Sequence, residues 1–300
     1  MIAPSNFGFN EEAFLTNKFQ NRPGSNEGES IQEKALSEFT AFVDQLKKLN
    51  VDVHVYSDVA DSKTPDSIFP NNWISTHQTG EMIVYPMAVS NRREERRMDI
   101  IQDILNHHTY NYYDFTDFEN LEPGMYLEGT GSMIFDHPNR AIYAAISPRS
   151  HEEVLESIAE ALDYSTVSFL SHGKTGELIY HTNVMMCIGK NYVIIGADTI
   201  AENQREIVLQ SIKESGKEII LLTNDQVYDH FAGNMIQIEN SKEETILVMS
   251  KTAYDSLNSN QLQRLNDLND HIVAADIPTI ERIGGGSARC MIAELFFPAG

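Results

Sequence analysis

The chain has 300 residues, of which 44 are acidic and 22 basic, giving a formal net charge of −22. This charge repels phosphate backbones and anionic membrane surfaces, so nucleic acids and membranes are not expected as partners. Two cysteines cannot form a disulfide framework, and neither cysteines nor histidines show the spacing of a metal site. No apolar stretch is long enough to span a membrane and no secretory signal opens the chain, so we expect a soluble, cytoplasmic protein without metal or cofactor.

Four segments of the chain repeat one order of elements, a pair of short β-rich runs, an amphipathic helix and a further strand. The paired runs are expected at 73–77 with 82–85, 132–135 with 141–146, 184–188 with 192–195, and 235–238 with 245–249. The helices are expected near 91–106, 150–162, 202–215 and 251–268, and the following strands at 110–115, 165–170, 218–222 and 271–275.

A fifth unit is divided between the two ends of the chain. A C-terminal run at 290–297 is expected to pair with a strand near 1–3, followed by a helix over 30–49 and a strand at 51–56. Dividing one unit between the termini would seal a ring of ββαβ repeats. The sequence therefore predicts one domain over 1–300, with an ordinary α/β sandwich of evenly spaced strands as the alternative.

Chemically active residues precede the first strand of several repeats. Glu128 lies in LEGTGS, His181 in YHTNV and Cys290 in GGGSARC, while PNNW with Asn72 opens the first hairpin. Equivalent positions of a pseudo-symmetric ring meet at one end of its axis, so we expect these four residues to converge. A carboxylate, an imidazole and a thiol together indicate nucleophilic catalysis of the Cys–His type. Taken singly, each residue also fits a purely structural position.

The two cysteines are expected to differ in reactivity. Cys187 lies in the apolar run MMCI and is predicted to be a buried, unreactive strand residue. Cys290 follows three glycines at 284–286, and glycine permits a close approach of the backbone to a neighbour. We interpret these glycines as room for a planar substrate beside the thiol, with a slack surface loop as the alternative.

The motifs PDSIFPNNW, LEGTGS, YHTN, ISPRS and IGGGSARCM occur in this order over nearly the whole chain. They resemble the guanidine-modifying (pentein) superfamily, which includes arginine deiminases, dimethylarginine hydrolases and amidinotransferases. Within it the chain is most similar to the amidinotransferase-like subgroup of citrulline-utilisation hydrolases, whose NFGFNEE opening and PNNW motif it shares. The resemblance implies an α/β fold, a five-bladed propeller closed by its terminal strands, and a homodimer is one possible assembly.

The resemblance also implies a mechanism on a small amino-acid substrate. Cys290 would attack the planar carbon of a guanidino or ureido group to give a covalent S-linked intermediate. His181 would protonate the leaving amine and then activate water, while Glu128 would orient the imidazole. The implied substrate contacts are Asp66 for the α-amino group, Arg93 and Arg149 for the α-carboxylate with Arg92 an equally good partner, and Asn71, Asn72 and Asn183.

Two asparagines determine the expected charge of the substrate. Arginine deiminases and amidinotransferases carry aspartates where this chain has Asn72 and Asn183, and those aspartates clamp a cationic guanidinium. Amides leave a buried cation unpaired, which is costly, whereas a neutral ureido group can exchange hydrogen bonds with them. The sequence therefore predicts a C–N hydrolase of the Cys-His-Glu type that converts citrulline to ornithine, ammonia and carbon dioxide.

Other activities stay open at this point. Arginine, methylarginine or agmatine could be hydrolysed, or an amidino group transferred, because water and an amine attack the same intermediate. A papain-like peptidase is disfavoured by the order Glu, His, Cys, and a scaffold such as a ribosomal anti-association factor would not need those residues in register. Residues 10–30, polar with Phe14 and Phe19, are expected to form a lid or, alternatively, a packed surface loop.

Overall fold

The computed structural model describes residues 1–24, 28–59 and 63–297, and these residues form five small sheets. The first two three-stranded sheets contain β3 (Ile74–Thr76), β4 (Glu81–Val84), β5 (Asn111–Asp114), and β6 (Ile134–Asp136), β7 (Ala141–Ala145), β8 (Ser165–Phe169). The other two contain β9 (Met186–Ile188), β10 (Tyr192–Ile195), β11 (Glu218–Leu221), and β12 (Ile236–Glu239), β13 (Thr245–Ser250), β14 (His271–Ala275). The fifth sheet pairs β1 (Ile2–Ala3) with β2 (Tyr56–Ser57).

Each three-stranded sheet has the same internal order. Its first two strands form an antiparallel hairpin, and its third strand runs parallel to the second after a helical crossover. The helices are α1 (Gly28–Lys48), α2 (Met98–His107), α3 (Gly129–Ser132), α4 (Glu152–Leu162), α5 (Glu202–Glu214), α6 (Asn224–His230), α7 (Lys251–Ser256), α8 (Ser259–Asp267) and α9 (Pro278–Gly284). The predicted α/β class and the repeated order of elements are confirmed.

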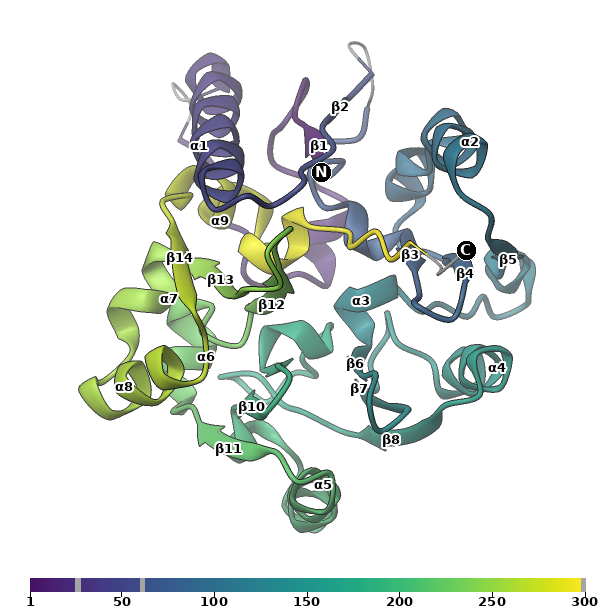
Figure 1. Ribbon diagram of the computed structural model, residues 1–300. Coiled ribbons are helices and arrows are strands. Elements are labelled where there is room, and N and C mark those ends of the chain that lie inside the picture. The colour runs from purple at the N-terminus through teal and green to yellow at the C-terminus, as the bar shows by residue number, and fades with distance from the viewer. Residues whose placement is uncertain (25–27, 60–62, 298–300) are drawn as a thin grey trace.

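Figure 1 shows the sheets disposed around a common centre, with α1, α2, α4, α5 and α8 on the outside. Each crossover helix buries one apolar face against its own sheet. In α4, Val154, Leu155 and Ile158 are fully buried against Ile142 of β7. Burying such a side chain contributes about 1.5–3 kcal/mol, so this packing fixes the helix over the sheet. Cys187 of β9 is buried as predicted, and burial raises the pKa of its thiol to about 12.

Two predicted helices have different limits. The helix expected at 91–106 begins only at Met98, because Ser90–Glu95 forms a 3-10 turn. The helix expected at 251–268 is divided into α7 and α8. Asn258 starts the second helix with a capping box. Its side chain accepts a hydrogen bond from the Gln261 N–H, and the Gln261 side chain accepts one from the Asn258 N–H.

The predicted pairing of the two terminal strands was wrong. In the part of the chain that the structure describes, β1 pairs only with β2, and residues 292–297 belong to no strand. The C-terminal segment instead runs through the centre of Figure 1, held by side chains. The Thr76 hydroxyl donates to the Glu294 carbonyl at 3.1 Å and accepts from the Phe296 N–H at 2.8 Å. These bonds satisfy backbone groups that a strand ladder would have paired.

Along the described stretches, no helix has both the length and the apolar character that crossing a bilayer requires.

Candidate active site

Four short helical turns bring one cluster of predicted site residues together. They are η2 (Pro70–Asn72), α3 (Gly129–Ser132), η5 (Thr182–Val184) and η7 (Ala288–Met291). Asn71, Asn72, Asn183 and Cys290 lie on the turns, and Glu128 and His181 immediately precede theirs. The turn α3 packs against η2 and η5, and η7 packs against η2. Each turn precedes or replaces the first strand of its repeat, so the convergence expected from repeat equivalence is observed.

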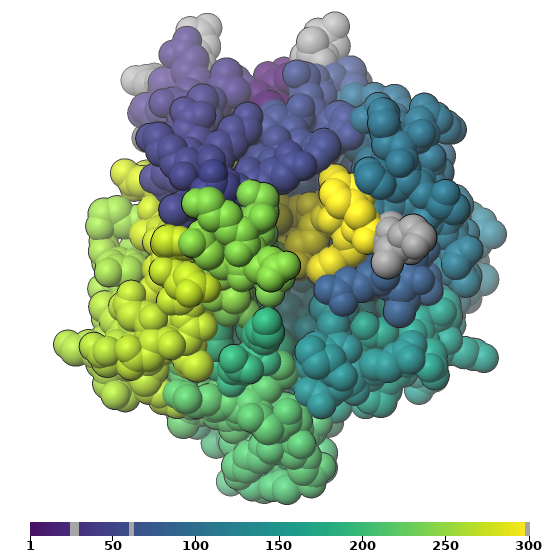
Figure 2. Space-filling model, in the orientation of Figure 1, coloured from purple at the N-terminus to yellow at the C-terminus, as the bar shows by residue number. Residues whose placement is uncertain are grey.

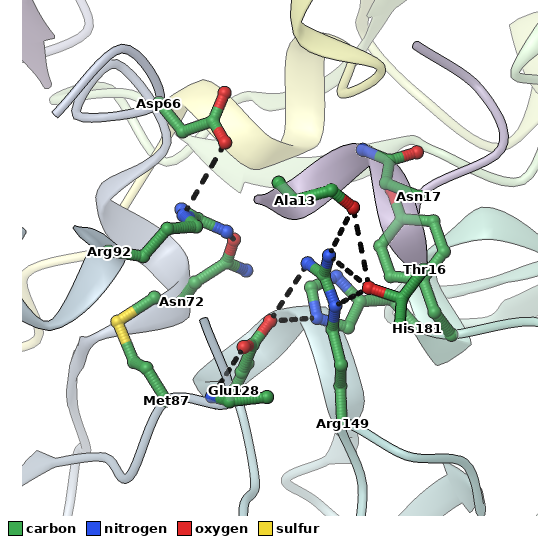
Figure 3. Close-up of polar contacts among 12 residues, drawn as sticks. Ala13, Thr16, Asn17, Asp66, Asn72, Met87, Arg92, Glu128, Arg149 and His181 are labelled. Atoms are coloured by element: carbon green, nitrogen blue, oxygen red, sulfur yellow. Dashed lines mark hydrogen bonds and ion pairs between the residues drawn. The ribbon is translucent and has the colours of Figure 1, made fainter. Parts of the chain in front are cut away.

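The carboxylate of Glu128 and the imidazole of His181 form the central pair of this cluster (Figure 3). Oε2 of Glu128 lies 2.7 Å from Nε2 of His181, and both side chains are almost fully buried. The second carboxylate oxygen accepts the backbone N–H of Ala88 at 3.0 Å. Because Nε2 donates to the carboxylate, Nδ1 of the neutral ring keeps its lone pair and can accept a proton.

Burial and charge shift both members of this pair. Burial alone would raise the pKa of Glu128, but Arg149 and the hydrogen bond from His181 outweigh it and hold that pKa below its ordinary value. Burial lowers the pKa of His181 to about 4, with Glu128 opposing the shift. The pair is therefore an ionised carboxylate beside a neutral imidazole at neutral pH.

Arg149 connects the pair to the N-terminal segment. Its Nη1 lies 3.4 Å from Oε2 of Glu128, while Nη2 donates to the Ala13 carbonyl at 3.0 Å and to the Thr16 hydroxyl at 2.6 Å (Figure 3). The guanidinium also lies over the ring of Tyr180, with 4.9 Å between Cζ and the ring centroid. Arg149 thus lies in the cluster and contacts both the Glu128 carboxylate and the N-terminal residues Ala13 and Thr16.

Cys290 enters the cluster on η7, 6% exposed, between two asparagines. Nδ2 of Asn183 lies 3.4 Å from Sγ, and Nδ2 of Asn234 lies 3.3 Å from it. Asn183 was expected here from the HTN motif. Asn234 was not, although FAGNM stands before the fourth hairpin at the position where the other repeats carry Asn72, Glu128 and His181.

Only one of the two neighbouring arginines faces the cluster. Arg92 is buried, donates twice to Glu95 at 2.8 Å and once to Asn72 Oδ1 at 2.8 Å, and has its Nε 3.8 Å from Asp66. Burial raises the pKa of Asp66, with Arg92 opposing the shift. Arg93 lies outside the cluster, where its half-buried side chain contacts Glu119. Arg92 is therefore the arginine beside Asp66, and which of the two arginines contacts a substrate stays a prediction.

Several polar atoms of the cluster are buried without a hydrogen-bond partner among the described residues. They are Oδ1 of Asp66, both carboxamide atoms of Asn71, Nδ2 of Asn72 and Oδ1 of Asn183. Buried polar atoms are rarely left unpaired, and a ligand is one way to satisfy them. Gly131 allows Asn72 and His181 to pack closely against its backbone, because a Cβ there would lie 2.5 Å from Nδ2 of Asn72 and 2.7 Å from Nδ1 of His181.

The predicted cover lies over this cluster. The turn at Ala13–Leu15 contacts Arg149, and Asn10 donates to Asp66 at 2.8 Å. Phe19 packs against Tyr180, with ring centroids 6.2 Å apart. The described residues of 10–30 therefore form a packed cover, while 25–27 within that range lie outside the described residues.

The three glycines at 284–286 pack closely against other parts of the chain. Gly285 ends α9 in the left-handed conformation, with φ of 62°, and a Cβ there would lie 2.7 Å from the Gln20 nitrogen. A Cβ on either neighbouring glycine would lie 2.9 Å from the ring of Phe69. The glycines therefore allow close packing against the cover and the core, and their role beside a planar substrate stays a prediction.

A separate cavity lies outside this cluster. It measures about 460 Å³ and is lined by strands of all four three-stranded sheets and by the C-terminal segment, with His77, Arg289 and Glu294 among its polar residues. Figure 2 shows the molecule hollowed beside that segment. None of the predicted catalytic or substrate-binding residues lines this cavity. His77 of this cavity also has an Nδ1 without a partner in the described structure and a pKa that burial lowers to about 3. The candidate active site is nevertheless the buried cluster, because five polar atoms unpaired among the described residues lie there beside an ionised carboxylate paired with a neutral imidazole.

Solved structures share the fold of the chain. The N-terminal domain of ArgZ, an arginine dihydrolase from the ornithine-ammonia cycle in cyanobacteria, has a TM-score of 0.74 at 17% identity, over 99% of this chain and 98% of that chain. AgrE with ornithine and NAD⁺ has a TM-score of 0.74 at 16% identity, over 97% of this chain and 38% of that chain. A dimethylarginine dimethylaminohydrolase adduct with S-methyl-L-thiocitrulline has a TM-score of 0.63 at 15% identity, over 97% and 96%.

No curated protein sequence matches the chain. Residues 3–297, however, match the family described as N,N dimethylarginine dimethylhydrolase, eukaryotic. This match covers nearly the whole chain and agrees with the order of the sequence motifs. The chain belongs to the N,N dimethylarginine dimethylhydrolase family, within the guanidine-modifying superfamily.

Proposed function

We propose that the chain hydrolyses the ureido group of citrulline to give ornithine, ammonia and carbon dioxide, through an S-linked intermediate on Cys290. The family supports hydrolysis at a guanidino-type carbon. The choice of a neutral substrate rests on one observation, the orientation of the Asn72 carboxamide.

The Asn72 carboxamide is oriented by Arg92. Nη1 of Arg92 can only donate, so the atom that it meets at 2.8 Å is the oxygen of the amide. Nδ2 therefore points away as a buried donor without an acceptor among the described residues, close to Gly131, against which Nδ1 of His181 also lies. A guanidinium offers only N–H donors and leaves this donor unpaired, whereas the ureido oxygen of citrulline accepts its hydrogen bond.

Asn183 supplies the complementary group. Its Nδ2 donates toward Sγ of Cys290, which leaves Oδ1 as a buried acceptor without a partner. The N–H groups of a ureido substrate would donate to that oxygen. The Asn72 donor and the Asn183 acceptor thus match a ureido group, which carries both an acceptor oxygen and N–H donors. Neither asparagine supplies the negative charge that a buried cationic substrate needs.

The buried pair supports a proton path in which His181 starts neutral. The thiol proton of Cys290 passes to Nδ1 of His181 as sulfur attacks the ureido carbon, and Glu128 stabilises the imidazolium that forms. His181 then gives this proton to the leaving amine. Water, deprotonated by His181, attacks the S-linked carbon and releases the thiol. The sum consumes one water per citrulline and yields ornithine, ammonia and carbon dioxide.

The α-amino acid end would be held beside Asp66. Its unpaired Oδ1 is an acceptor for the α-ammonium group. Arg92 and Arg149 are the guanidinium groups of the cluster available to the α-carboxylate, and such planar forks suit a carboxylate. Arg149 would exchange its bonds to the cover for bonds to the substrate.

We also propose that the five sheets are the blades of one propeller domain over 1–300. Four sheets share one strand order, and four of the five units supply a turn to the site. The C-terminal segment would complete the fifth blade through contacts other than a strand ladder.

A second candidate is hydrolysis of arginine directly to ornithine. It is favoured by the fold shared with ArgZ, which is named as an arginine dihydrolase. Two successive hydrolyses of arginine pass through citrulline by atom balance, so both candidates require the ureido step at Cys290. They differ in whether the cationic substrate is accepted first.

The test supplies citrulline, arginine and N,N-dimethylarginine separately to the purified protein and measures ornithine, citrulline and ammonia by mass spectrometry. We expect ornithine from citrulline and little turnover of the two cationic substrates, with Cys290→Ser as the inactive control. Ornithine from arginine with transient citrulline would favour the second candidate. Citrulline that accumulates from a cationic substrate and is not consumed would overturn the ureido proposal.

A further inference from the structure

We propose that Asn234 is a positioning residue for the nucleophile, which fixes the turn carrying Cys290 and donates a hydrogen bond to its thiolate. This inference rests on the proposed function only in taking Cys290 as the nucleophile. Asn234 comes from the fourth repeat, which supplies no charged side chain to the cluster, and it is 2% exposed.

The orientation of the Asn234 carboxamide is determined by two backbone groups. Its Oδ1 accepts the N–H of Arg289 at 3.1 Å, and its Nδ2 donates to the carbonyl of Asn183 at 3.2 Å. If the amide oxygen and nitrogen were exchanged, the amide N–H would face the Arg289 N–H, and the amide oxygen would face the Asn183 carbonyl. Neither pair could form a hydrogen bond. The atom 3.3 Å from Sγ of Cys290 is therefore a donor.

The geometry favours the thiolate over the thiol. With Asn183, Asn234 directs two N–H donors at Sγ, at 3.4 and 3.3 Å. Hydrogen bonds donated to the charged form stabilise that form. A protonated thiol finds only Oδ1 of Asn234 at 3.6 Å, an acceptor already used by the Arg289 N–H. The two amides thus support the charge that appears when the thiol proton leaves.

Asn234 reaches Cys290 because the backbone at Gly233 lies directly against the backbone at Val184. Helix α6 ends at Phe231, which adopts the left-handed conformation with φ of 54°, and the Asn234 N–H returns to the Phe231 carbonyl at 2.9 Å. A Cβ on Gly233 would lie 2.3 Å from the Val184 carbonyl oxygen. Gly233 therefore lets the segment lie directly against η5, which carries Asn183, and this contact delivers the carboxamide to Cys290.

Asn234 acts on the main chain as well as on the sulfur, because its Oδ1 accepts the N–H of Arg289. Arg289 immediately precedes Cys290 in η7, a single 3-10 turn. Holding its N–H anchors the residue from which the nucleophile projects. Alanine at 234 would remove the donor to sulfur and leave the Arg289 N–H buried without its acceptor.

The experiment measures the rate of Cys290 alkylation by iodoacetamide from pH 5 to 10, in a Cys187→Ser background that leaves one thiol. We expect Asn234→Ala to move the pH midpoint of alkylation upward by about one unit, because one hydrogen bond to a charged group is lost. Asn234→Asp keeps the acceptor for the Arg289 N–H but replaces the donor with an anion, so its midpoint should move further in the same direction.

The matched control is Asn240→Ala, which removes a buried asparagine at the other end of β12. Asn240 donates to the Leu49 carbonyl at 2.8 Å and makes no contact with the cluster in the described structure. This control should lower the melting temperature and leave the alkylation profile unchanged. If Asn234→Ala and Asn234→Asp fold but keep the wild-type midpoint, the proposal is overturned. Alkylation needs no substrate, so a failure of the citrulline proposal would be seen separately, in the turnover assay.

Discussion

Oε2 of Glu128 serves two partners, Nε2 of His181 at 2.7 Å and Nη1 of Arg149 at 3.4 Å. One buried carboxylate oxygen therefore orients the imidazole and is itself held by the guanidinium. Since the other oxygen accepts from the main chain, the carboxylate has no freedom to turn away from the histidine.

This arrangement predicts the result of Glu128→Gln. The amide can place an N–H toward His181 and so favour the wrong tautomer, and it cannot stabilise an imidazolium. We expect kcat for citrulline to fall about 10²- to 10⁴-fold with a folded protein. Steady-state kinetics with circular dichroism check this, and Glu94→Gln, at an exposed position in the chain, is the control. Unchanged kcat in Glu128→Gln would remove Glu128 from the mechanism.

The low pKa of His181 predicts how stability depends on pH. Its folded pKa is lowered from 6.5 to about 4, so between these values the unfolded chain binds a proton that the folded chain does not. Stability from this group is complete above pH 6.5 and is lost as the pH falls toward 4. In His181→Gln, the free energy of unfolding measured with urea should depend less on pH between 4 and 6.5. The surface variant His54→Gln should keep the pH dependence of the wild type. If the free energy of unfolding had the same slope against pH in the wild type and both variants, the lowered pKa of His181 would be contradicted.

The orientation of Asn72 predicts a change in substrate preference. Asn72→Asp supplies an anion at the reacting end while keeping an acceptor for Arg92. We expect the ratio of kcat/KM for arginine to that for citrulline to rise by about tenfold or more, a change of about 1.4 kcal/mol. Asn183→Asp is less informative, because its charge would lie 3.4 Å from Sγ and slow the thiol itself. A ratio unchanged by Asn72→Asp would remove the charge argument.

The bond between Arg149 and the cover predicts an effect on substrate binding. Thr16→Val preserves shape but removes the hydroxyl that accepts from Nη2 and Nε of Arg149. We expect KM for citrulline to fall by about tenfold or more with kcat less affected. Arg149 no longer has to give up these hydrogen bonds when it turns to the substrate, and hydrogen bonds to charged groups contribute about 1.5–3 kcal/mol. Thr40→Val, on an exposed part of α1, should change neither constant. A larger effect on kcat than on KM would mean that the cover acts in the chemical step.

The two neighbouring arginines should differ sharply. Arg92→Ala leaves Glu95 and Asp66 buried without their cation, and breaking a buried ion pair costs about 3–5 kcal/mol. Arg93→Ala removes a half-buried contact with Glu119 that Arg96 also makes, so we expect a change of about 1 kcal/mol or less. Thermal unfolding and KM measured together check this pair. A larger rise in KM for Arg93→Ala than for Arg92→Ala would reverse the assignment.

The repeated order of elements explains why the centre of the site was predictable. Glu128, His181 and Cys290 stand at equivalent positions of three repeats, so their convergence follows from the pattern. Asn234 stands at the same position of the fourth repeat and was passed over, because an uncharged amide suggests no chemistry by itself. Its importance depends on its contact with Cys290, which no sequence spacing reveals.

Other features depend on contacts that local pattern cannot provide. Arg92 and Arg93 are adjacent in one 3-10 turn and point to different neighbours, so only the packed structure separates them. The apolar run at 290–297 has the composition of a strand, yet the Thr76 hydroxyl and the Tyr110 hydroxyl take its backbone groups instead. The preference of a segment for the β conformation does not specify which partner will pair with it.

The packing of Gly285 links the cover to the segment that carries Cys290. Asn17 and Gln20 of the cover donate to the carbonyls at 284 and 285, at the end of the helix that leads to Cys290. Lifting the cover would break these bonds, so exposure of the sulfur and loosening of its turn would occur in one movement. With the cover in place, Cys290 is only 6% exposed. A thiol buried to this extent would react slowly with dissolved oxidants for as long as the cover stays in place.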